Sequence, residues 1–357
     1  MNYIGSKFSL LNFLQEGIET TVNGLRGGTL LDIFAGTGAV GRHFKARGYH
    51  IVANDIQYYS YCMNRALVGI NSTPKFSHLL DSISTASLSL FDDPVDLVLG
   101  HLNGLEGIEG FVYENYCPGG TENDTHPRQY YTDANGKRCD AIRTRLNEWR
   151  GSGLIDDDEF FYLLASLIDA VDKVANTASV YGAFLKHIKK TAQKSLTLQR
   201  LEIVEGRKEC DVYNEDGLTL VGETSCDILY MDPPYNQRQY CANYHVLETI
   251  ARYDSPALRG VTGLRPYQDQ KSKWCAKREV ACEFEKVVAA TSAKHVFLSY
   301  SSEGLMARDV VLDIMTKYGE PRLMTKDYGR FRADVDGDNR VYKADRVEEY
   351  LFCLTKG

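Results

Sequence analysis

The sequence lacks the usual features of membrane, secreted and metal-binding proteins. None of its apolar runs approaches the roughly 18 to 20 residues that a membrane-spanning helix needs. The first residues contain no basic segment, long apolar core or small-residue cleavage site of a signal peptide, so we expect a cytoplasmic protein. The nine cysteines are odd in number and are never spaced as CxxC. This argues against a disulfide framework and against a zinc site, so we expect no metal.

Repeats, low-complexity tracts and an excess of basic charge are absent as well. The chain has 357 residues, enough for one large domain or two smaller ones. Its net charge of −7 argues by itself against nucleic-acid binding, because phosphate contacts need Lys and Arg. However, residues 173–201 contain six basic residues and no acidic one, and residues 238–278 contain eight basic residues and three acidic ones. Such runs are typical of solvated helix faces, but two of them on an acidic chain also indicate a polarised surface.

What the sequence does contain is a short apolar run, residues 226–231, that is followed by Asp232-Pro233-Pro234-Tyr235. A short apolar run between turn signals predicts a buried strand. The two prolines cannot continue a sheet ladder, and each biases the residue before it toward an extended backbone. We therefore expect a stiff loop that holds Asp232 and Tyr235 at the carboxyl end of the strand, where open α/β sheets place their sites. The alternative is an ordinary Pro-Pro turn.

This loop has the groups that would activate a planar amine such as the exocyclic nitrogen of adenine. That nitrogen is a poor nucleophile because its lone pair is delocalised into the ring. Hydrogen bonds from the amine to the Asp232 carboxylate and the Pro233 carbonyl would favour a tetrahedral nitrogen. The ring of Tyr235 would stack on the base and hold it in place.

A second motif is the glycine-rich turn after another predicted strand, residues 29–34. The turn, residues 35–41, leads into a helix through Lys45, and glycines there allow a ligand to approach the backbone and the helix N-terminus. The next predicted strand, residues 49–53, ends in Asn54-Asp55, where Rossmann-like sheets bind ribose hydroxyls with an acidic residue. The turn lacks the complete dinucleotide fingerprint, so it predicts a nucleotide-like ligand without identifying it.

The rest of the chain alternates predicted strands and helices. Such alternation indicates a mostly parallel α/β sheet covered on both faces. The further strands are expected near residues 210–213, 294–300 and 348–354, and the helices at residues 58–68, 158–194 and 244–253. Asp216 would then lie at the same rim of the sheet as Asp55 and Asp232.

Residues 101–155 differ in character, because Gly, Asn and Asp are frequent there and basic residues alternate with aromatic ones. Residues 133–137, Asp-Ala-Asn-Gly-Lys, predict a turn between short extended pieces. We expect an inserted region over residues 101–205, with residues 1–100 and 206–357 forming the catalytic domain. The interleaved bases and rings suit contact with phosphates and nucleobases, but also suit any exposed β-ribbon. The candidate DNA contacts from this region and from the two basic runs are Arg128, Lys137, Arg138, Lys186, Lys190, Arg238, Tyr240 and Lys273.

Taken in order, three blocks resemble the N6-adenine DNA methyltransferases of the α arrangement, the Dam-like enzymes. They are Tyr3-Ile4-Gly5-Ser6-Lys7, Asp32-Ile33-Phe34-Ala35-Gly36-Thr37-Gly38 and Asp232-Pro233-Pro234-Tyr235. The resemblance implies a Rossmann-like fold that binds S-adenosylmethionine and carries an inserted target-recognition region. It implies cofactor contacts from Tyr3, Lys7, Asp32, Phe34, Gly36, Gly38, Asp55 and Asp216. It also implies that Asp232, Pro233, Pro234 and Tyr235 hold the target adenine.

The resulting hypothesis is a site-specific DNA methyltransferase that flips an adenine out of duplex DNA and methylates its N6 without a metal. An RNA adenine methyltransferase, or one that acts on a guanine amine, is the nearest alternative because a flipped planar amine poses the same chemical problem. A DNA-binding module without catalysis would be expected to lack the glycines or the Asp232 loop. A protein glutamine methyltransferase would be expected to have Asn where Asp232 stands. The recognition sequence, the oligomeric state and a role in restriction-modification, with a separate endonuclease, or in a phage or orphan context are left open.

Overall fold

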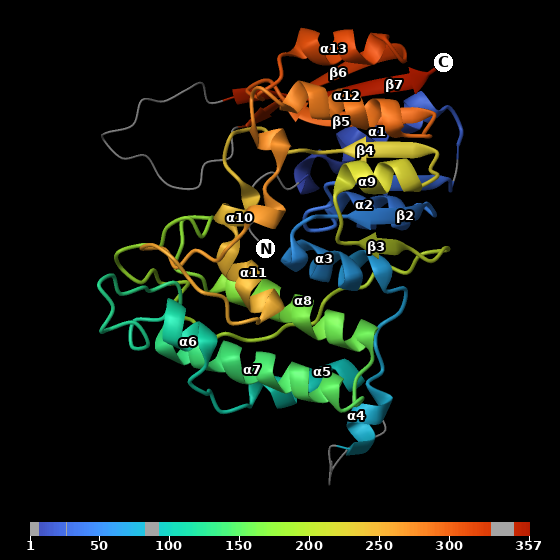
Figure 1. Cartoon of the computed structure of the whole chain (residues 1–357). Helices are drawn as coiled ribbons and strands as arrows, with labels where there is room; N and C mark the ends of the chain where they lie inside the picture. Colours follow the sequence, from blue (N-terminus) through green and yellow to red (C-terminus); the bar gives the residue numbers. More distant parts are fainter. Residues whose placement is uncertain (1–6, 26, 83–92, 330–345) are drawn as a thin grey trace. The chain divides into compact units, whose positions relative to one another are not determined.

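The computed structural model describes residues 7–25, 27–82, 93–329 and 346–357. The chain divides into two compact units (Figure 1). The described part of the first, which we call the helical unit, comprises Cys62–Glu205 and Cys241–Tyr267; the second, the sheet unit, comprises the described residues up to Tyr61 together with Gly206–Tyr240 and Gln268–Gly357. The helical unit is therefore larger than the expected insertion at residues 101–205, because it begins at Cys62 and includes a later segment.

The sheet unit contains, in its described residues, one seven-stranded sheet of order β3-β2-β1-β4-β5-β7-β6. The strands are β1 (Thr29–Asp32), β2 (His50–Asn54), β3 (Asp211–Tyr213), β4 (Ile228–Met231), β5 (His295–Ser301), β6 (Gly319–Gly329) and β7 (Arg346–Lys356). The first five are parallel, and β7 runs antiparallel between β5 and β6. This is the predicted α/β sheet. Strand β6 was missed because it is a polar edge strand that pairs with β7 on one side.

Helices cover both faces of this sheet (Figure 1). The α-helices that lie wholly within the described part of the sheet unit are α1 (Leu11–Val22), α2 (Ala39–Lys45), α9 (Gly217–Glu223), α12 (Val280–Ala290) and α13 (Arg308–Thr316). The unit also contains the short 3-10 helices η1 (Phe8–Leu10), η3 (Gln268–Gln270) and η4 (Lys273–Cys275). Helix α12 contacts both α9 and α13, and their buried side chains form one core with the strands, which includes Phe284, Val296 and Phe352. Helix α1 packs on β5 and β7 at close range, since a Cβ at Gly17 would collide with Leu351 Cδ2.

The order of the strands creates a switch point between β1 and β4. From β1 the chain continues to β2 and then β3 on one side, and returns to β4 on the other side. In parallel sheets of this kind a crevice opens at the carboxyl ends of the two strands where the order reverses. Both sequence motifs, the glycine turn and the Asp232 loop, leave the sheet at this edge.

The helical unit is built around α8 (Asp157–Lys173), which is buried along most of its length. The other helices are the π-helix η2 (Arg65–Gly69), α4 (Ser77–Ser82), α5 (Pro94–Asn103), α6 (Phe111–Tyr116), α7 (Asp133–Gly151) and α11 (His245–Arg252). Helix α8 begins with a capping box, in which Asp156 accepts from the Glu159 N–H at 2.8 Å and Glu159 accepts from the Asp156 N–H at 3.1 Å. Along the chain, the division into units falls within helix α3 (Tyr58–Asn64), after Tyr61, and within helix α10 (Tyr240–Asn243), after Tyr240.

The structure corrects the prediction of a turn at residues 133–137, which are the first turn of α7. Thr132 is the N-cap of this helix and accepts from the Asn135 N–H at 3.3 Å. Asn135 is buried and bonds through its amide to the carbonyls of Ala192 and Lys194. Gly136 is required for packing, because a Cβ there would collide with Cys117 Sγ. The two residues that resemble a turn therefore serve tertiary contacts.

The predicted helix over residues 158–194 was also too long, because α8 ends at Lys173. The chain after it is held by side chains of the same unit. Asn176 donates to the carbonyls of Gln129 and Leu185, each at 3.0 Å, and accepts from the Lys189 N–H. Ser166 of α8 donates to the Gln199 carbonyl at 2.7 Å. These contacts satisfy backbone groups that a longer helix would have paired internally.

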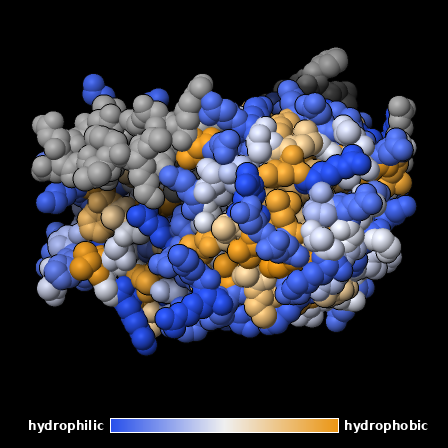
Figure 2. All heavy atoms as spheres, turned by 90° about the horizontal axis from the view of Figure 1, so that it is seen from above, coloured by the Kyte–Doolittle hydropathy of each residue, from blue (hydrophilic) through white to orange (hydrophobic). Residues whose placement is uncertain are grey.

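In the described residues, no helix is both long enough and apolar enough to cross a bilayer. Hydrophilic residues lie among hydrophobic ones over the face that Figure 2 shows.

Candidate active site

The loop after β4 carries the predicted catalytic residues. Strand β4 is buried throughout and ends at Met231, so Asp232 is the first residue beyond the ladder. The Asp232 side chain is 16% exposed, Pro233 is buried, and Pro234 and Tyr235 are half-buried. The Tyr235 hydroxyl donates to Asp232 Oδ1 at 2.7 Å, and its ring meets the ring of Tyr300 edge-on at 5.3 Å. The loop thus presents one carboxylate and one aromatic ring in a fixed relation.

Lys7 brings a positive charge to this carboxylate from the start of the chain. Its Nζ lies 3.3 Å from Asp232 Oδ1 and 3.2 Å from Glu349 Oε2, and it also donates to the Tyr235 hydroxyl oxygen. The Lys7 and Glu349 side chains are only 4% and 8% exposed. A single ammonium group therefore bridges two largely buried carboxylates, which is how buried charge is tolerated.

The electrostatics of this cluster are dominated by burial. Desolvation raises the pKa of Asp232, and the Lys7 charge and the Tyr235 hydrogen bond counteract it. Desolvation likewise raises the pKa of Glu349. The positive charge of Lys7 lowers this pKa, and the negative charge of Asp232 raises it. The pKa of the Tyr235 phenol lies well above its usual value for the same reason, so the hydroxyl remains a donor. Such shifted groups are frequent at functional sites.

The glycine turn lies between β1 and α2 at the same edge of the sheet. Gly36 and Gly38 have φ angles of +53° and +77°, a backbone region that favours glycine. Asp55 follows β2 and accepts from the Gly36 N–H and the Gln57 N–H, each at 2.9 Å. Asp32 is buried at the end of β1 and accepts from the Phe34 N–H at 3.2 Å, and desolvation raises its pKa well above the usual value.

Two further predicted cofactor contacts have defined surroundings. Phe34 is half-buried and meets the ring of Trp274 edge-on at 5.1 Å. Asp216 is exposed and is the N-cap of α9, with Oδ1 accepting from the N–H groups of Leu218 and Thr219 at 3.1 Å. Tyr3 lies outside the described residues.

The loops at this edge are held together by Asn54, a buried residue at the end of β2. Its amide donates to the Glu215 carbonyl at 3.1 Å and accepts from the Glu215 N–H at 3.0 Å. Asn54 also accepts, through its backbone carbonyl, from the Ala35 N–H at 2.9 Å. This one residue therefore links the chain after β1 to the chain after β3.

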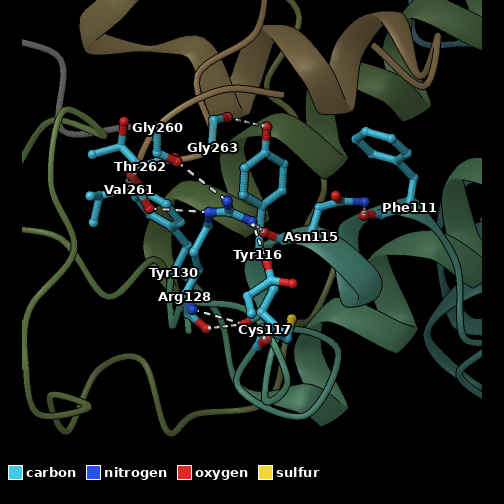
Figure 3. A network of polar contacts seen from close by, with 12 residues as sticks. Phe111, Asn115, Tyr116, Cys117, Arg128, Tyr130, Gly260, Val261, Thr262 and Gly263 are labelled. Carbon is cyan, nitrogen blue, oxygen red and sulfur yellow. Dashed lines mark hydrogen bonds and ion pairs between the residues drawn. The ribbon is translucent and has the colours of Figure 1, made fainter. Parts of the chain in front are cut away.

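In the helical unit, three of the predicted DNA contacts are engaged by the protein itself. The Arg128 guanidinium donates to the carbonyls of Asn115, Gly260 and Val261 and forms an ion pair with Asp124 at 3.2 Å (Figure 3). At least four of its five N–H groups are thus used, and the residue fixes the loop at Gly260 and Val261. Lys137 pairs with Glu109 at 2.7 Å, and Arg138 donates to the Asn103 carbonyl at 3.1 Å.

The other predicted DNA contacts are more accessible. Lys186 and Lys190 are exposed on the helical unit. In the sheet unit, Arg238 is exposed and Tyr240 is half-buried at the start of α10. Lys273 is 64% exposed and lies 3.9 Å from Glu283 Oε1, a distance at which solvent screens the pair.

Sequence reasoning missed Glu349, which is the second carboxylate at Lys7, and Trp274, which supports Phe34. The signal for Glu349 was a charged residue in a strand that is otherwise apolar on its buried face. Among the described residues, no group of three or more His, Cys, Asp or Glu side chains is arranged to hold a metal ion.

Comparison with known proteins identifies the family. Residues 3–312 match the family described as D12 class N6 adenine-specific DNA methyltransferase. The chain is 43% identical to Type II methyltransferase M.NlaIII of Neisseria lactamica over 359 residues, which covers 100% of this chain and 99% of the relative. It is 39% identical to Type II methyltransferase M.FokI of Planomicrobium okeanokoites, covering 100% of this chain but 53% of that protein. It is 35% identical to Type II methyltransferase M.CviAII of Paramecium bursaria Chlorella virus 1, covering 99% of this chain and 98% of the relative.

A solved structure, a putative RNA methyltransferase from Pyrococcus horikoshii, aligns with a TM-score of 0.29 and 9% identity over 98% of this chain and 81% of that chain. A similarity this low carries no argument about this chain. The family is identified by the sequence match over residues 3–312. The Asp-Pro-Pro-Tyr loop at the switch point of the parallel sheet agrees with this match. The chain belongs to the D12 class of N6 adenine-specific DNA methyltransferases.

Proposed function

We propose that this site-specific adenine DNA methyltransferase takes its methyl group from S-adenosylmethionine and transfers it to N6 of an adenine flipped out of duplex DNA. The observation that carries the proposal is the loop of Asp232, Pro233, Pro234 and Tyr235 at the carboxyl end of β4. A largely buried carboxylate beside an aromatic ring is the set of groups that a planar amine on a flat base requires.

The residues after β1 and β2 fit S-adenosylmethionine. The Asp55 carboxylate suits the hydroxyls of a ribose, because it stands just beyond the end of β2 and the N–H groups of Gly36 and Gln57 orient its two oxygens. The positive φ angles of Gly36 and Gly38 let a ligand approach the backbone closely. Phe34 would line the pocket, and Oδ2 of Asp216 would accept from the cofactor's adenine amine. When bound, this cofactor supplies an electrophilic methyl group.

The chain's own residues would prepare the amine. Asp232 and the Pro233 carbonyl would accept its two hydrogen bonds, which favours a tetrahedral nitrogen with an available lone pair. The two prolines fix the backbone, so these acceptors need little reorganisation when the amine arrives. Asp232 would also be the acceptor in this loop for the proton that the amine loses. Tyr235 would stack on the base and hold the nitrogen in place.

Flipping is needed because a base inside the stack cannot reach a buried site, and it costs a few kcal/mol. We assign target recognition to the helical unit, of which the expected insertion at residues 101–205 is the larger part. Its exposed lysines, Lys186 and Lys190, suit phosphate contacts, as do Arg238 and Lys273 of the sheet unit. Arg128, Lys137 and Arg138 would act indirectly, by holding the surface that meets DNA.

The relatives suggest the biological setting. The three relatives described above are named type II methyltransferases, which supports a role in restriction-modification. We therefore propose a cytoplasmic enzyme that protects DNA from a separate endonuclease with the same recognition sequence. A phage or orphan enzyme would have the same chemistry without that partner.

The proposal is tested by incubating the protein with tritiated S-adenosylmethionine and unmethylated bacterial duplex DNA, and then mapping the modified bases by single-molecule sequencing. We expect N6-methyladenine within one short motif. If the protein binds the cofactor but labels structured RNA and not DNA, the assignment of the substrate is wrong.

A further inference from the structure

Glu349 is a buried carboxylate that faces the reaction site from the far end of the chain. It lies on β7 opposite Ser301, the last residue of β5. Because β4 and β5 are parallel neighbours, this position is at the carboxyl edge of the sheet, where Asp232 leaves β4. The side chain is 8% exposed, and its Oε2 lies 3.2 Å from Lys7 Nζ.

The hydrogen bonds of Asp232 Oδ1 show where a second carboxylate can act. Asp232 Oδ1 accepts from Tyr235 at 2.7 Å and lies 3.3 Å from Lys7 Nζ. An ionised carboxylate oxygen has about two acceptor sites, and both sites on Oδ1 are therefore used within the protein. For Oδ1 to accept a hydrogen bond from an incoming amine, one of these donors must leave. Lys7 can leave only if its charge has another partner, because an unpaired buried ammonium is costly.

We propose that Glu349 is a positioning residue that holds the Lys7 ammonium while Asp232 exchanges Lys7 for the amine of the target base. This inference rests on the proposed function, in which Asp232 binds that amine. Lys7 already lies at hydrogen-bonding distance from both carboxylates, so the exchange requires a shift of one flexible ammonium group and no rearrangement of the sheet. Glu349 does not touch the substrate in this account and acts through Lys7.

The surrounding titratable groups support the same assignment. Those that face Glu349 are Lys7, Asp232 and the phenols of Tyr230 and Tyr235, and Lys326 is its cross-strand partner on β6. Burial and the charge of Asp232 both raise the pKa of Glu349. As the pH falls, protonation of Glu349 removes the second partner of Lys7 and leaves Lys7 on Asp232. Substitution by glutamine imitates this protonated state at every pH.

The test compares Glu349→Gln with Glu348→Gln on a duplex that contains the mapped recognition site. Glu348 is the neighbouring residue on β7, is exposed and accepts from the Tyr350 hydroxyl at 3.0 Å, so its substitution is a matched control. We expect E349Q to lower kcat roughly tenfold, the scale of one hydrogen bond to a charged group. KM for DNA should be unchanged, and E348Q should resemble the wild type.

The pH profile separates positioning from a general structural role. The acidic limb of kcat should move to lower pH in E349Q, because the titration of Glu349 is removed and that of Asp232 remains. The inference is overturned if E349Q loses kcat while the acidic limb of its pH profile stays where it is in the wild type, or if E349Q has the wild-type kcat.

If E349Q does not fold, Glu349→Asp takes its place. We expect this variant to have a lower kcat at constant KM, and a wild-type kcat would overturn the inference.

A further variant distinguishes this inference from the proposed function. If Asp232→Asn abolishes transfer while E349Q behaves as the wild type, only the role of Glu349 fails. If Asp232→Asn retains transfer, the assignment of Asp232 fails first. Fluorescence of 2-aminopurine at the target position reports base flipping independently of chemistry, and we expect it to be equal in E349Q and the wild type.

Discussion

The Tyr235 hydroxyl donates a hydrogen bond of 2.7 Å to Asp232 Oδ1, so the proposed stacking residue also holds the proposed catalytic carboxylate. This bond lowers the pKa of Asp232 against the larger effect of burial, which raises it. The two functions of Tyr235, ring and hydroxyl, can therefore be separated by substitution.

Tyr235→Phe keeps the ring and removes the hydroxyl. Without the hydrogen bond the pKa of Asp232 rises further, and because transfer needs the ionised carboxylate, the acidic limb of kcat should move to higher pH. Transfer well above this limb should remain within a few-fold of the wild type, as followed by methyl-transfer rates across pH.

Tyr235→Ala removes the ring as well. Without its stacking on the base, worth about 1–3 kcal/mol, retention of the flipped base should weaken and transfer should fall at every pH.

Tyr350→Phe is the matched control for Tyr235→Phe, because the Tyr350 hydroxyl also donates to a carboxylate, that of Glu348. An unchanged limb in Tyr235→Phe would mean that the hydroxyl does not influence Asp232.

DNA contacts in the helical unit can be tested by their salt dependence. The double substitution of Lys186 and Lys190 by Ala should weaken DNA binding and lower the slope of log affinity against log salt by about 0.9 for each phosphate that the variant no longer neutralises. Arg128→Ala should leave that slope unchanged and lower stability instead, since Arg128 holds the carbonyls of Gly260 and Val261. Binding measured by fluorescence anisotropy at several salt concentrations distinguishes the two roles. A reduced slope in Arg128→Ala would contradict the assignment.

The packing of α7 gives a stability prediction. Gly136→Ala places a Cβ against Cys117 Sγ, well inside van der Waals contact, and overpacking of this kind costs typically about 1–3 kcal/mol. Gly151→Ala, at the end of the same helix, has no neighbour within 4 Å and should be neutral or stabilising by up to about 1 kcal/mol. Urea unfolding measures the stabilities of the two variants, and their midpoints can be compared directly if their m-values are equal. Equal midpoints for the two variants would show that the packing at Gly136 relaxes without cost.

Local patterns predicted the strands and turns around the candidate site, because these depend on residues that are close in sequence. The strand before Asp232, the glycine turn before α2 and the acidic residue after β2 were all found, because strand periodicity, proline and glycine act over a few positions. The alternation of strands and helices was sufficient to predict a largely parallel sheet. Edge strand β6 lacked the apolar run that marked its neighbours.

Other features depend on contacts that no local pattern encodes. Lys7 and Glu349 are 342 residues apart in sequence, so their ion pair could not be predicted from spacing. Asn135 and Gly136 are typical turn residues, but tertiary packing placed them in a helix. Arg128 has the chemistry of a DNA contact, and only the structure shows that its donors are used by the protein.

The most direct measurement of the central claim is single-turnover methyl transfer by Asp232→Asn, with Asp227→Asn as control. Asp227 lies at the opposite end of β4, is exposed and accepts from the Thr29 N–H at 2.8 Å. We expect Asp232→Asn to lose on the order of a hundredfold or more in rate while it binds the cofactor normally, because it removes one charged acceptor aimed at the reacting amine. Asp227→Asn should transfer at the wild-type rate. Transfer by Asp232→Asn at the rate of this control, or a joint loss of transfer and cofactor binding, would contradict the role of Asp232 in catalysis.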